Sequence, residues 1–267
     1  MTELLAHLQQ RRASGRKLLV PYVMAGAPQP QNFARVLEVL SRAADAVEIG
    51  IPYSDPLMDG PVIAAAGERA IRAGVGPLAA LELLDAAPGA VPRVAMTYYN
   101  PIHRLGERDF CSRAAAHGIT GLIVPDLPVE ESAGLRTAAA EWGLAWIPLV
   151  APTSSPERVK TIAGTATGFI YAVSTLGVTG TRAELSQRAA RVAAACRAAT
   201  DLPVLIGVGV STPEQARAAA AGADGVVIGS AVVKRVAEQG AEAARDFLLE
   251  VRAALDGVEA ADPAPAP

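Results

Sequence analysis

The sequence predicts an α/β fold, a closed barrel in which eight parallel strands alternate with helices. Three observations lead to this prediction. Short apolar segments alternate eight times with segments whose apolar residues recur every three to four positions. The strand segments are apolar throughout, which is typical of a parallel sheet covered by helices. The chain has 267 residues, 51% of them hydrophobic, which suits one barrel domain.

The first half of the chain shows this alternation clearly. Leucines at helical spacing over Thr2–Arg12 predict a short extra N-terminal helix that covers one end of the barrel. Leu18–Val23 is an apolar run that ends in a turn sequence, and Pro28–Ala43 repeats its apolar residues as an amphipathic helix does. The elements predicted next are a strand at Ala46–Ile49, helices at Val62–Ala73 and Leu78–Ala86, a strand at Arg93–Thr97 and a helix near Asp109–His117.

The second half continues the pattern and completes a (β/α)8 TIM barrel. Two helices begin at Pro156 and Pro213, each after Ser or Thr, which fits a capping box with proline at the first helical position. No linker divides residues 1–258, which are predicted to be a single domain, whereas the Ala/Pro-rich residues 259–267 are predicted to be a disordered tail. The other predicted elements are strands at Leu122–Val124, Trp146–Val150, Phe169–Val173, Val204–Ile206 and Val226–Ile228, and helices at Glu130–Trp142 and Leu185–Ala199.

Composition excludes several classes of function. The net charge is −3 and no long Lys/Arg cluster exists, so a nucleic-acid partner is not expected. No apolar run reaches the roughly 18 residues that span a bilayer, and the N-terminus does not resemble a signal peptide, so the chain is expected to be cytoplasmic with no membrane contact. Cys111 and Cys196 are expected to be reduced and structural. The three histidines lack metal-binding spacing, so no metal site is expected.

Two carboxylates stand out in the segment Val47–Pro61. The active site of such a barrel lies at the carboxyl ends of its strands. Glu48 lies between two apolar residues of a predicted strand, and Asp59 follows in a proline-rich loop. Two carboxylates in unlike surroundings can divide acid and base roles, because burial raises the pKa of only one of them. The alternative is that Glu48 is a paired structural carboxylate and that Asp55 and Asp59 only form turns.

Three loops at the same end of the barrel are rich in glycine and small hydroxyl residues. They are Val173–Gly180, Ile206–Ser211 and Ile228–Ala231. Small residues let backbone N–H groups approach an anion, and a helix that starts near Ser230 would add a favourable dipole, so these loops predict a phosphate site. The alternative is that the glycines serve tight turns only. The pattern at Gly207 does not continue as G-x-G-x-x-G, which excludes a dinucleotide fingerprint.

These segments closely resemble one family, the α subunit of tryptophan synthase, over Leu18 to Lys234. The resemblance is carried by V-E-I-G-I-P-Y-S-D-P-L-M-D-G-P and by five further blocks in the family's order, namely Met96–Pro101, Gly121–Pro128, Gly177–Gly180, Gly207–Ser211 and Gly229–Ala231. It implies an eight-stranded α/β barrel that cleaves indole-3-glycerol phosphate to indole and glyceraldehyde 3-phosphate for tryptophan biosynthesis. It also implies an αββα heterotetramer, with indole passing to a β subunit. This chain would hold no cofactor, since pyridoxal phosphate belongs to the β partner.

The resemblance also implies roles for individual residues. Glu48 would be the general acid and base, and Asp59 would accept the indole N–H. Asp55 and Pro56 would contact the β subunit. The residues that would bind the phosphorylated indole substrate are Tyr22, Tyr98, Tyr171, Thr179, Gly180, Gly209, Gly229 and Ser230.

Four positions depart from the family's usual pattern. Ala27 replaces Asp, Ala64 replaces Gln, Met58 replaces Ala and Thr175 replaces Arg. By the resemblance, Met58 and Thr175 fall in the loops that would close over the substrate and touch the partner. A freestanding lyase that releases indole, and a mainly allosteric partner subunit with weak catalysis, therefore stay open as alternatives. An unrelated phosphosugar isomerase on the same fold is a more distant one.

Overall fold

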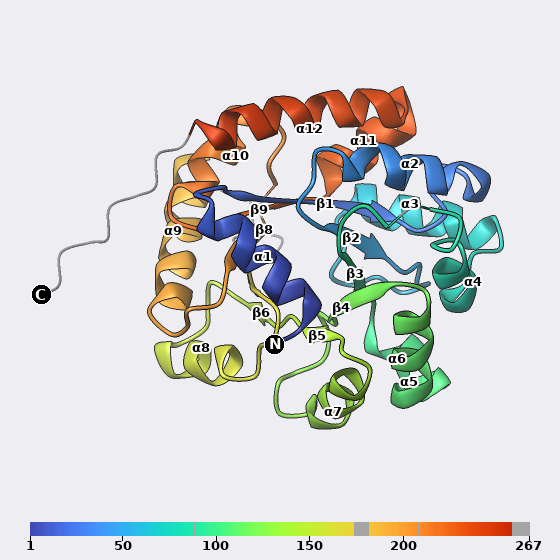
Figure 1. Cartoon of the computed structure of the whole chain (residues 1–267), viewed down its shortest axis with the longest axis horizontal. Helices are drawn as coiled ribbons and strands as arrows, with labels where there is room; N and C mark the ends of the chain where they lie inside the picture. Colours follow the sequence, from blue (N-terminus) through green and yellow to red (C-terminus); the bar gives the residue numbers. More distant parts are fainter. Residues whose placement is uncertain (88, 174–181, 208, 258–267) are drawn as a thin grey trace, which may run out of the picture.

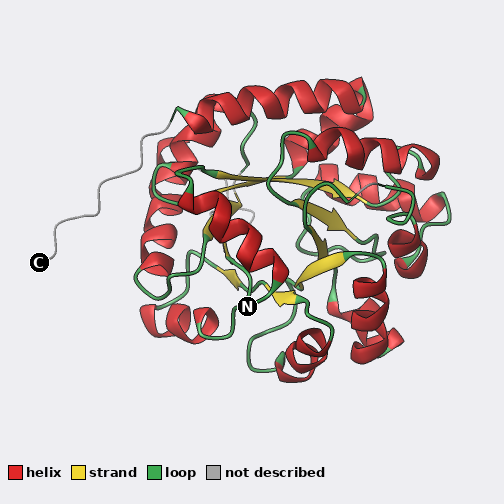
Figure 2. Cartoon of the chain, in the orientation of Figure 1, coloured by secondary structure: helices red, strands yellow, loops and turns green. Residues whose placement is uncertain are grey.

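The computed structural model describes residues 1–87, 89–173, 182–207 and 209–257, with side chains omitted for 182–187. Its strands form one parallel sheet in the order β5-β4-β3-β2-β1-β9-β8-β7-β6, surrounded by helices (Figures 1 and 2). The strands are β1 (Leu18–Met24), β2 (Val47–Gly50), β3 (Arg93–Met96), β4 (Ile119–Ile123), β5 (Ala145–Trp146), β6 (Leu149–Val150), β7 (Ile170–Val173), β8 (Val204–Gly207) and β9 (Gly225–Ile228).

The sheet closes into the predicted barrel through one segment of chain. β5 pairs with β4 and β6 pairs with β7, and the two strands replace the predicted strand Trp146–Val150, starting one residue earlier at Ala145. Ile147 N–H donates to Leu122 on one side, and the carbonyl of Pro148 accepts from Tyr171 N–H on the other. The fifth strand is split in two because Pro148 has no N–H to donate to a ladder.

The helices follow the predicted alternation. They are α1 (Glu3–Ala13), the 3-10 helix η1 (Pro30–Asn32), α2 (Phe33–Ser41), α3 (Pro61–Arg72), α4 (Pro77–Glu82), α5 (Tyr99–Leu105), α6 (Glu107–Ala116), α7 (Ala133–Glu141), α8 (Pro156–Ala163), α9 (Arg182–Arg197), α10 (Pro213–Ala220), α11 (Ser230–Gln239) and α12 (Ala241–Asp256). α5 and α12 are absent from the elements predicted above. The predicted helix Leu78–Ala86 is shorter, ending at Glu82. The predicted tail, 259–267, lies outside the described residues, so the division into one domain and a tail stays a prediction.

Two helix starts test the predicted capping. In α10 the side chain of Thr212 accepts from Gln215 N–H, and the side chain of Gln215 accepts from Thr212 N–H. Together these bonds form a complete capping box. In α8 the side chain of Ser155 accepts from Arg158 N–H, but Glu157 is the second helical residue, whereas the capping box needs the third, which is Arg158. The capping-box prediction was therefore wrong at α8, although proline stands at the start of both helices.

Helix α1 closes the amino ends of the strands, as predicted. Leu4 and Leu8 are fully buried and pack with side chains inside the barrel, including Leu18 and Phe169. The contact is close because Gly121 has no side chain: a Cβ there would lie 2.9 Å from Leu4 Cδ2. The amino end of the barrel is thus sealed by apolar packing, and the opposite end remains for a site.

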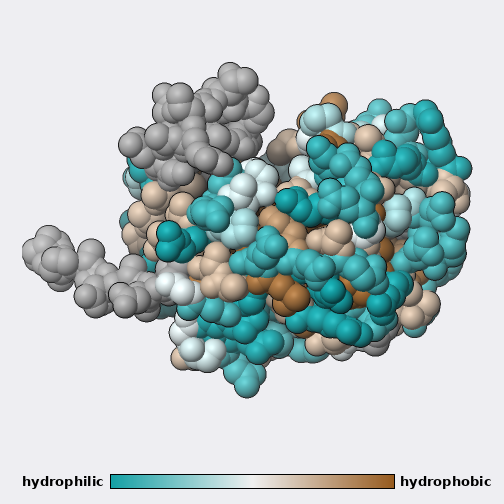
Figure 3. Space-filling model, turned by 90° about the horizontal axis from the view of Figure 1, so that it is seen from above, coloured by the Kyte–Doolittle hydropathy of each residue, from teal (hydrophilic) through white to brown (hydrophobic). Residues whose placement is uncertain are grey.

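The outer helices are polar toward solvent. Figure 3 views α2, α11 and α12 from outside and shows hydrophilic side chains over most of that face, with apolar ones visible between them. Arg35 of α2 forms ion pairs with Glu38 and with Glu242 of α12. Exposed pairs of this kind contribute little to stability. In the part of the chain that is described, no helix is long and apolar enough to cross a membrane.

One buried carboxylate ties α12 to the barrel. Asp45 is fully buried; its Oδ2 accepts from Leu19 N–H at 2.9 Å and from Arg252 at 2.5 Å, and its Oδ1 accepts from Arg16 at 3.0 Å. Arg252 also donates to the carbonyl of Lys17. Removing one partner from such a network leaves a buried charge without compensation.

We expect Asp45→Asn to lower the free energy of unfolding by about 3 to 5 kcal/mol, because the buried side chain of Arg252 would lose its buried counter-charge and keep only Asp256, which is 47% exposed. Urea denaturation measures the change. Asp246→Asn is the matched control, since Asp246 pairs with Arg245 but is 60% exposed. Equal effects of the two substitutions would contradict a special role for the Asp45 network.

Candidate active site

Glu48 is a buried carboxylate inside the barrel. It lies on β2, opposite Tyr22 of β1 and Val94 of β3, while its neighbours Val47 and Ile49 face the outer helices. Its side chain is 1% exposed, and neither carboxylate oxygen has a hydrogen-bond partner. Burial, reinforced by the charge of Asp59, raises the pKa of Glu48 to about 8. The structure therefore places a protonated carboxyl group at the carboxyl end of the strands near neutral pH.

Asp59 is the second carboxylate, on the loop between β2 and α3. Tyr98 donates to its Oδ1 at 3.1 Å. Burial raises the pKa of Asp59, and this hydrogen bond, which favours the ionised form, lowers it. The two predicted carboxylates are thus brought together, Glu48 without a partner and Asp59 with one.

Two of the predicted tyrosines occupy space left by glycines. Gly50 follows Glu48 on the same face of β2, and a Cβ there would lie 1.9 Å from the Tyr22 hydroxyl. In the same way, a Cβ on Gly207 would lie 2.2 Å from the Tyr171 ring. Burial raises the pKa of both tyrosines well above the ordinary value, with Asp59 and Glu48 adding to the effect on Tyr22. Both phenols therefore stay neutral and surround Glu48.

The predicted phosphate loops are described in part. Gly229 precedes α11, which begins at Ser230 as predicted, and Ser230 is exposed. A Cβ on Gly209 would meet no atom within 4 Å, so open space lies beside it. Thr179 and Gly180 lie outside the described residues, as does Thr175.

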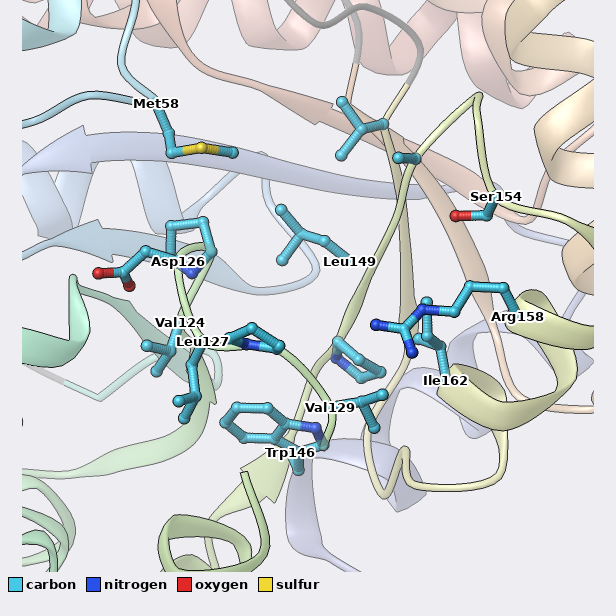
Figure 4. A pocket seen from close by; sticks show the side chains of 15 residues that line it. Met58, Val124, Asp126, Leu127, Val129, Trp146, Leu149, Ser154, Arg158 and Ile162 are labelled. Carbon is cyan, nitrogen blue, oxygen red and sulfur yellow. The ribbon is translucent and has the colours of Figure 1, made fainter. Parts of the chain in front are cut away.

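The loop predicted to contact a partner is exposed. Asp55 is exposed, Pro56 is half-buried, and Leu57 is 93% exposed. A pocket of about 330 Å³ begins beside Met58 on this loop and extends to Trp146 and Arg158 (Figure 4). Its lining comes from Met58, Val124, Pro125, Asp126, Leu127, Pro128, Val129, Trp146, Pro148, Leu149, Ala151, Ser154, Arg158, Ile162 and Val173.

Sequence reasoning missed the glycines and the contacts between loops. Gly50 and Gly207 make room for Tyr22 and Tyr171, and the only signal in the sequence was a glycine at the end of an otherwise apolar strand. The bond between Tyr98 and Asp59 joins loops 39 residues apart, which no local pattern could reveal. Among the described residues no group of three or more His, Cys, Asp or Glu side chains could hold a metal ion.

Comparisons with known proteins agree with this geometry. The family model for the tryptophan synthase alpha chain matches residues 8–261. The chain belongs to the tryptophan synthase α chain family. The α chain of Synechocystis sp. is 46% identical over 252 residues, covering 91% of this chain and 96% of the relative.

Solved structures of tryptophan synthase share the fold. A structure from Mycobacterium tuberculosis is 39% identical, with a TM-score of 0.88, covering 95% of this chain and 98% of the other. The tryptophan synthase α subunit of Legionella pneumophila is 32% identical, also with a TM-score of 0.88, covering 97% and 100%. The TIM barrel, the N-terminal helix and the resemblance to this family are confirmed.

The departures from the family's pattern leave the carboxylates in place. None of the contacts described above for Glu48 and Asp59 involves Ala27 or Ala64. Met58 is half exposed, and its backbone N–H donates to the Tyr98 hydroxyl at 2.9 Å. Because the main chain makes this bond, an alanine at position 58 could make it as well.

Glu48 should make the stability of the wild-type chain fall as pH rises from about 5 to about 8. In that window the unfolded state has already released the proton, whereas folded Glu48 keeps it up to its pKa of about 8. Glu48→Gln should therefore gain stability relative to wild type across the window, by a few kcal/mol. Urea denaturation at several pH values measures this. Glu250→Gln, at an exposed glutamate of α12, is the control; the same pH trend in both variants would refute the assignment.

Proposed function

We propose that the chain cleaves indole-3-glycerol phosphate by a retro-aldol reaction, giving indole and glyceraldehyde 3-phosphate, as the α subunit of a tryptophan synthase. The observation that carries the proposal is Glu48, a buried carboxyl group without a hydrogen-bond partner, with its pKa raised to about 8 and with Asp59 beside it. Membership of the α chain family supports the same lyase reaction.

The reaction needs two proton transfers that one carboxyl group can perform in turn. Indole C3 must gain a proton, which gives the ring a positive charge. The glycerol hydroxyl beside the breaking bond must lose a proton, so that its oxygen becomes the aldehyde carbonyl while the electrons of the carbon–carbon bond return to the ring. Glu48 gives its proton to C3 and then takes the hydroxyl proton, which restores the acid. A pKa of about 8 supplies the protonated form needed for the first step.

Asp59 has the complementary role. An ionised carboxylate accepts the indole N–H and balances the positive charge that develops on the ring. The hydrogen bond from Tyr98 supports the ionised form. Tyr22, Tyr98 and Tyr171 line the space for the indole ring, and the neutral phenols of Tyr22 and Tyr171 lie near Glu48 without competing for its proton.

The phosphate would bind at the loops after β7, β8 and β9. The start of α11 presents unpaired backbone N–H groups and the positive end of the helix dipole to an anion. The residues proposed to hold the phosphate are Gly209, Gly229 and Ser230, with Gly180, and Thr179 is proposed to order the site when it closes.

The proposal includes a β partner. The α chain family implies a β subunit, and pyridoxal phosphate belongs to that subunit, so we propose no cofactor for this chain. We propose the loop of Asp55 and Pro56 as a contact with the β subunit, an αββα heterotetramer as the assembly, and the cytoplasm as its location. The exposure of Leu57 on the same loop supports a surface that a partner covers.

Indole release from indole-3-glycerol phosphate, measured with and without a tryptophan synthase β subunit, tests the function. We expect slow release alone and strong stimulation by the β subunit, and no release by Glu48→Gln. Fast release that ignores the β subunit would identify a freestanding lyase. Stimulation of the β reaction without indole release would identify an allosteric subunit, and no effect in either assay would reject the family's reaction.

A charge at Ser230 should weaken substrate binding. Ser230→Asp places a negative charge at the start of α11, where the phosphate is proposed to bind, and should raise KM at least about tenfold with a smaller change in kcat. Ser230→Asn has nearly the same size without the charge and is the control. If Asp and Asn raise KM equally, the phosphate does not bind at this helix.

A further inference from the structure

The hydroxyl of Tyr98 makes two hydrogen bonds to adjacent residues of one loop. It accepts from Met58 N–H at 2.9 Å and donates to Asp59 Oδ1 at 3.1 Å. The first bond satisfies the oxygen as acceptor and thereby directs the hydroxyl hydrogen toward the carboxylate. Because Tyr98 engages Oδ1, the other oxygen of Asp59 stays available to a substrate.

The ring of Tyr98 packs against Tyr53, at the beginning of the same loop. The rings of Tyr53 and Tyr98 lie 5.2 Å apart at an interplanar angle of 31°. Between these two attachment points the loop is solvent-facing, since Leu57 is 93% exposed and Met58 50% exposed. One buried side chain therefore contacts the loop near both of its ends, and the loop between has little packing of its own.

Tyr98 is itself fixed from a third loop. It is the residue before α5, and the next residue, Tyr99, donates its backbone N–H to both oxygens of Asp126 at 2.9 and 3.2 Å. Asp126 follows β4, and it lines the pocket of Figure 4 together with Met58. The loops after β2, β3 and β4 are thus joined in one chain of contacts, from Asp126 through Tyr98 to Asp59.

We propose that Tyr98 is a positioning residue for Asp59: its hydroxyl holds the carboxylate in the orientation that accepts the indole N–H, and couples that orientation to the exposed loop of residues 53–59. The proposal rests on the function proposed above, in which Asp59 balances the charge on the ring. It gives Tyr98 a role beyond lining the indole space, because the ring alone could do the lining.

The groups around this hydrogen bond determine the direction in which its loss would shift the pKa of Asp59. Loss of the Tyr98 hydrogen bond would remove a stabilisation of ionised Asp59, and burial would then raise its pKa further. The ionisable groups that face the pair come from three elements, and they are Tyr22, Glu48 and Asp126. All of them are acidic groups, so none can supply the positive charge that would replace the bond.

Tyr98→Phe tests the proposal because it deletes the hydroxyl and keeps the ring against Tyr53. With indole-3-glycerol phosphate as substrate and the β subunit present, we expect kcat to fall about 10- to 100-fold with a smaller change in KM. The acidic limb of the pH profile of kcat should move to higher pH. Tyr99→Phe is the matched control, because its hydroxyl bonds Glu107 at 2.9 Å and should leave both quantities unchanged.

A substrate-free readout separates this inference from the proposed reaction. The carboxyl carbon of Asp59, followed by ¹³C NMR, should titrate at higher pH in Tyr98→Phe than in wild type. If wild type releases no indole but this shift is present, the proposed reaction fails while the Tyr98 contact stands. Unchanged kcat, pH profile and Asp59 titration in Tyr98→Phe would overturn the positioning role, as would a rise in KM alone.

Discussion

The desolvation of Glu48 is the constraint on which the rest of the site depends. A carboxyl group buried without a hydrogen-bond partner cannot remain ionised at low cost, so it holds its proton to about pH 8. The surrounding residues maintain this condition. Tyr22 and Tyr171 fill the space above Gly50 and Gly207 and exclude water, while neither donates a hydrogen bond that would stabilise the carboxylate.

Stability and chemistry lie at opposite ends of the barrel. At the amino end, α1 packs into the barrel through Leu4 and Leu8, and Asp45 is paired with buried arginine. At the carboxyl end, Glu48 is buried unpaired and the loop of Leu57 is exposed. A barrel whose core is sealed at one end can tolerate an unfavourable buried group at the other, which is the usual division of such folds.

Local patterns were enough to predict the barrel and the position of its two carboxylates. Apolar strand runs and helical periodicity depend on neighbours in the sequence, and the alternation of faces placed Glu48 inward. Contacts between distant segments were not predictable. α5 is too short to show periodicity and its first amide is bonded by Asp126, 27 residues away. The break in the fifth strand had a local signal, Pro148, but the pairing of its two parts with β4 and β7 did not.

The split fifth strand divides the barrel into two half-sheets that share β1. One half, β1 to β5, carries both carboxylates, and the other, β6 to β9, ends in the loops proposed to hold phosphate. Opposite β1 the described parts of the two halves are joined by the backbone around Pro148, where the hydrogen-bond ladder is shortest, and by the ion pair of Arg158 with Glu130. A substrate held by its indole beside β2 and by its phosphate at the start of α11, after β9, would bridge the two halves on either side of β1. Occupancy of the site would then brace the two half-sheets where they share a strand, and would leave the join at Pro148 as it is.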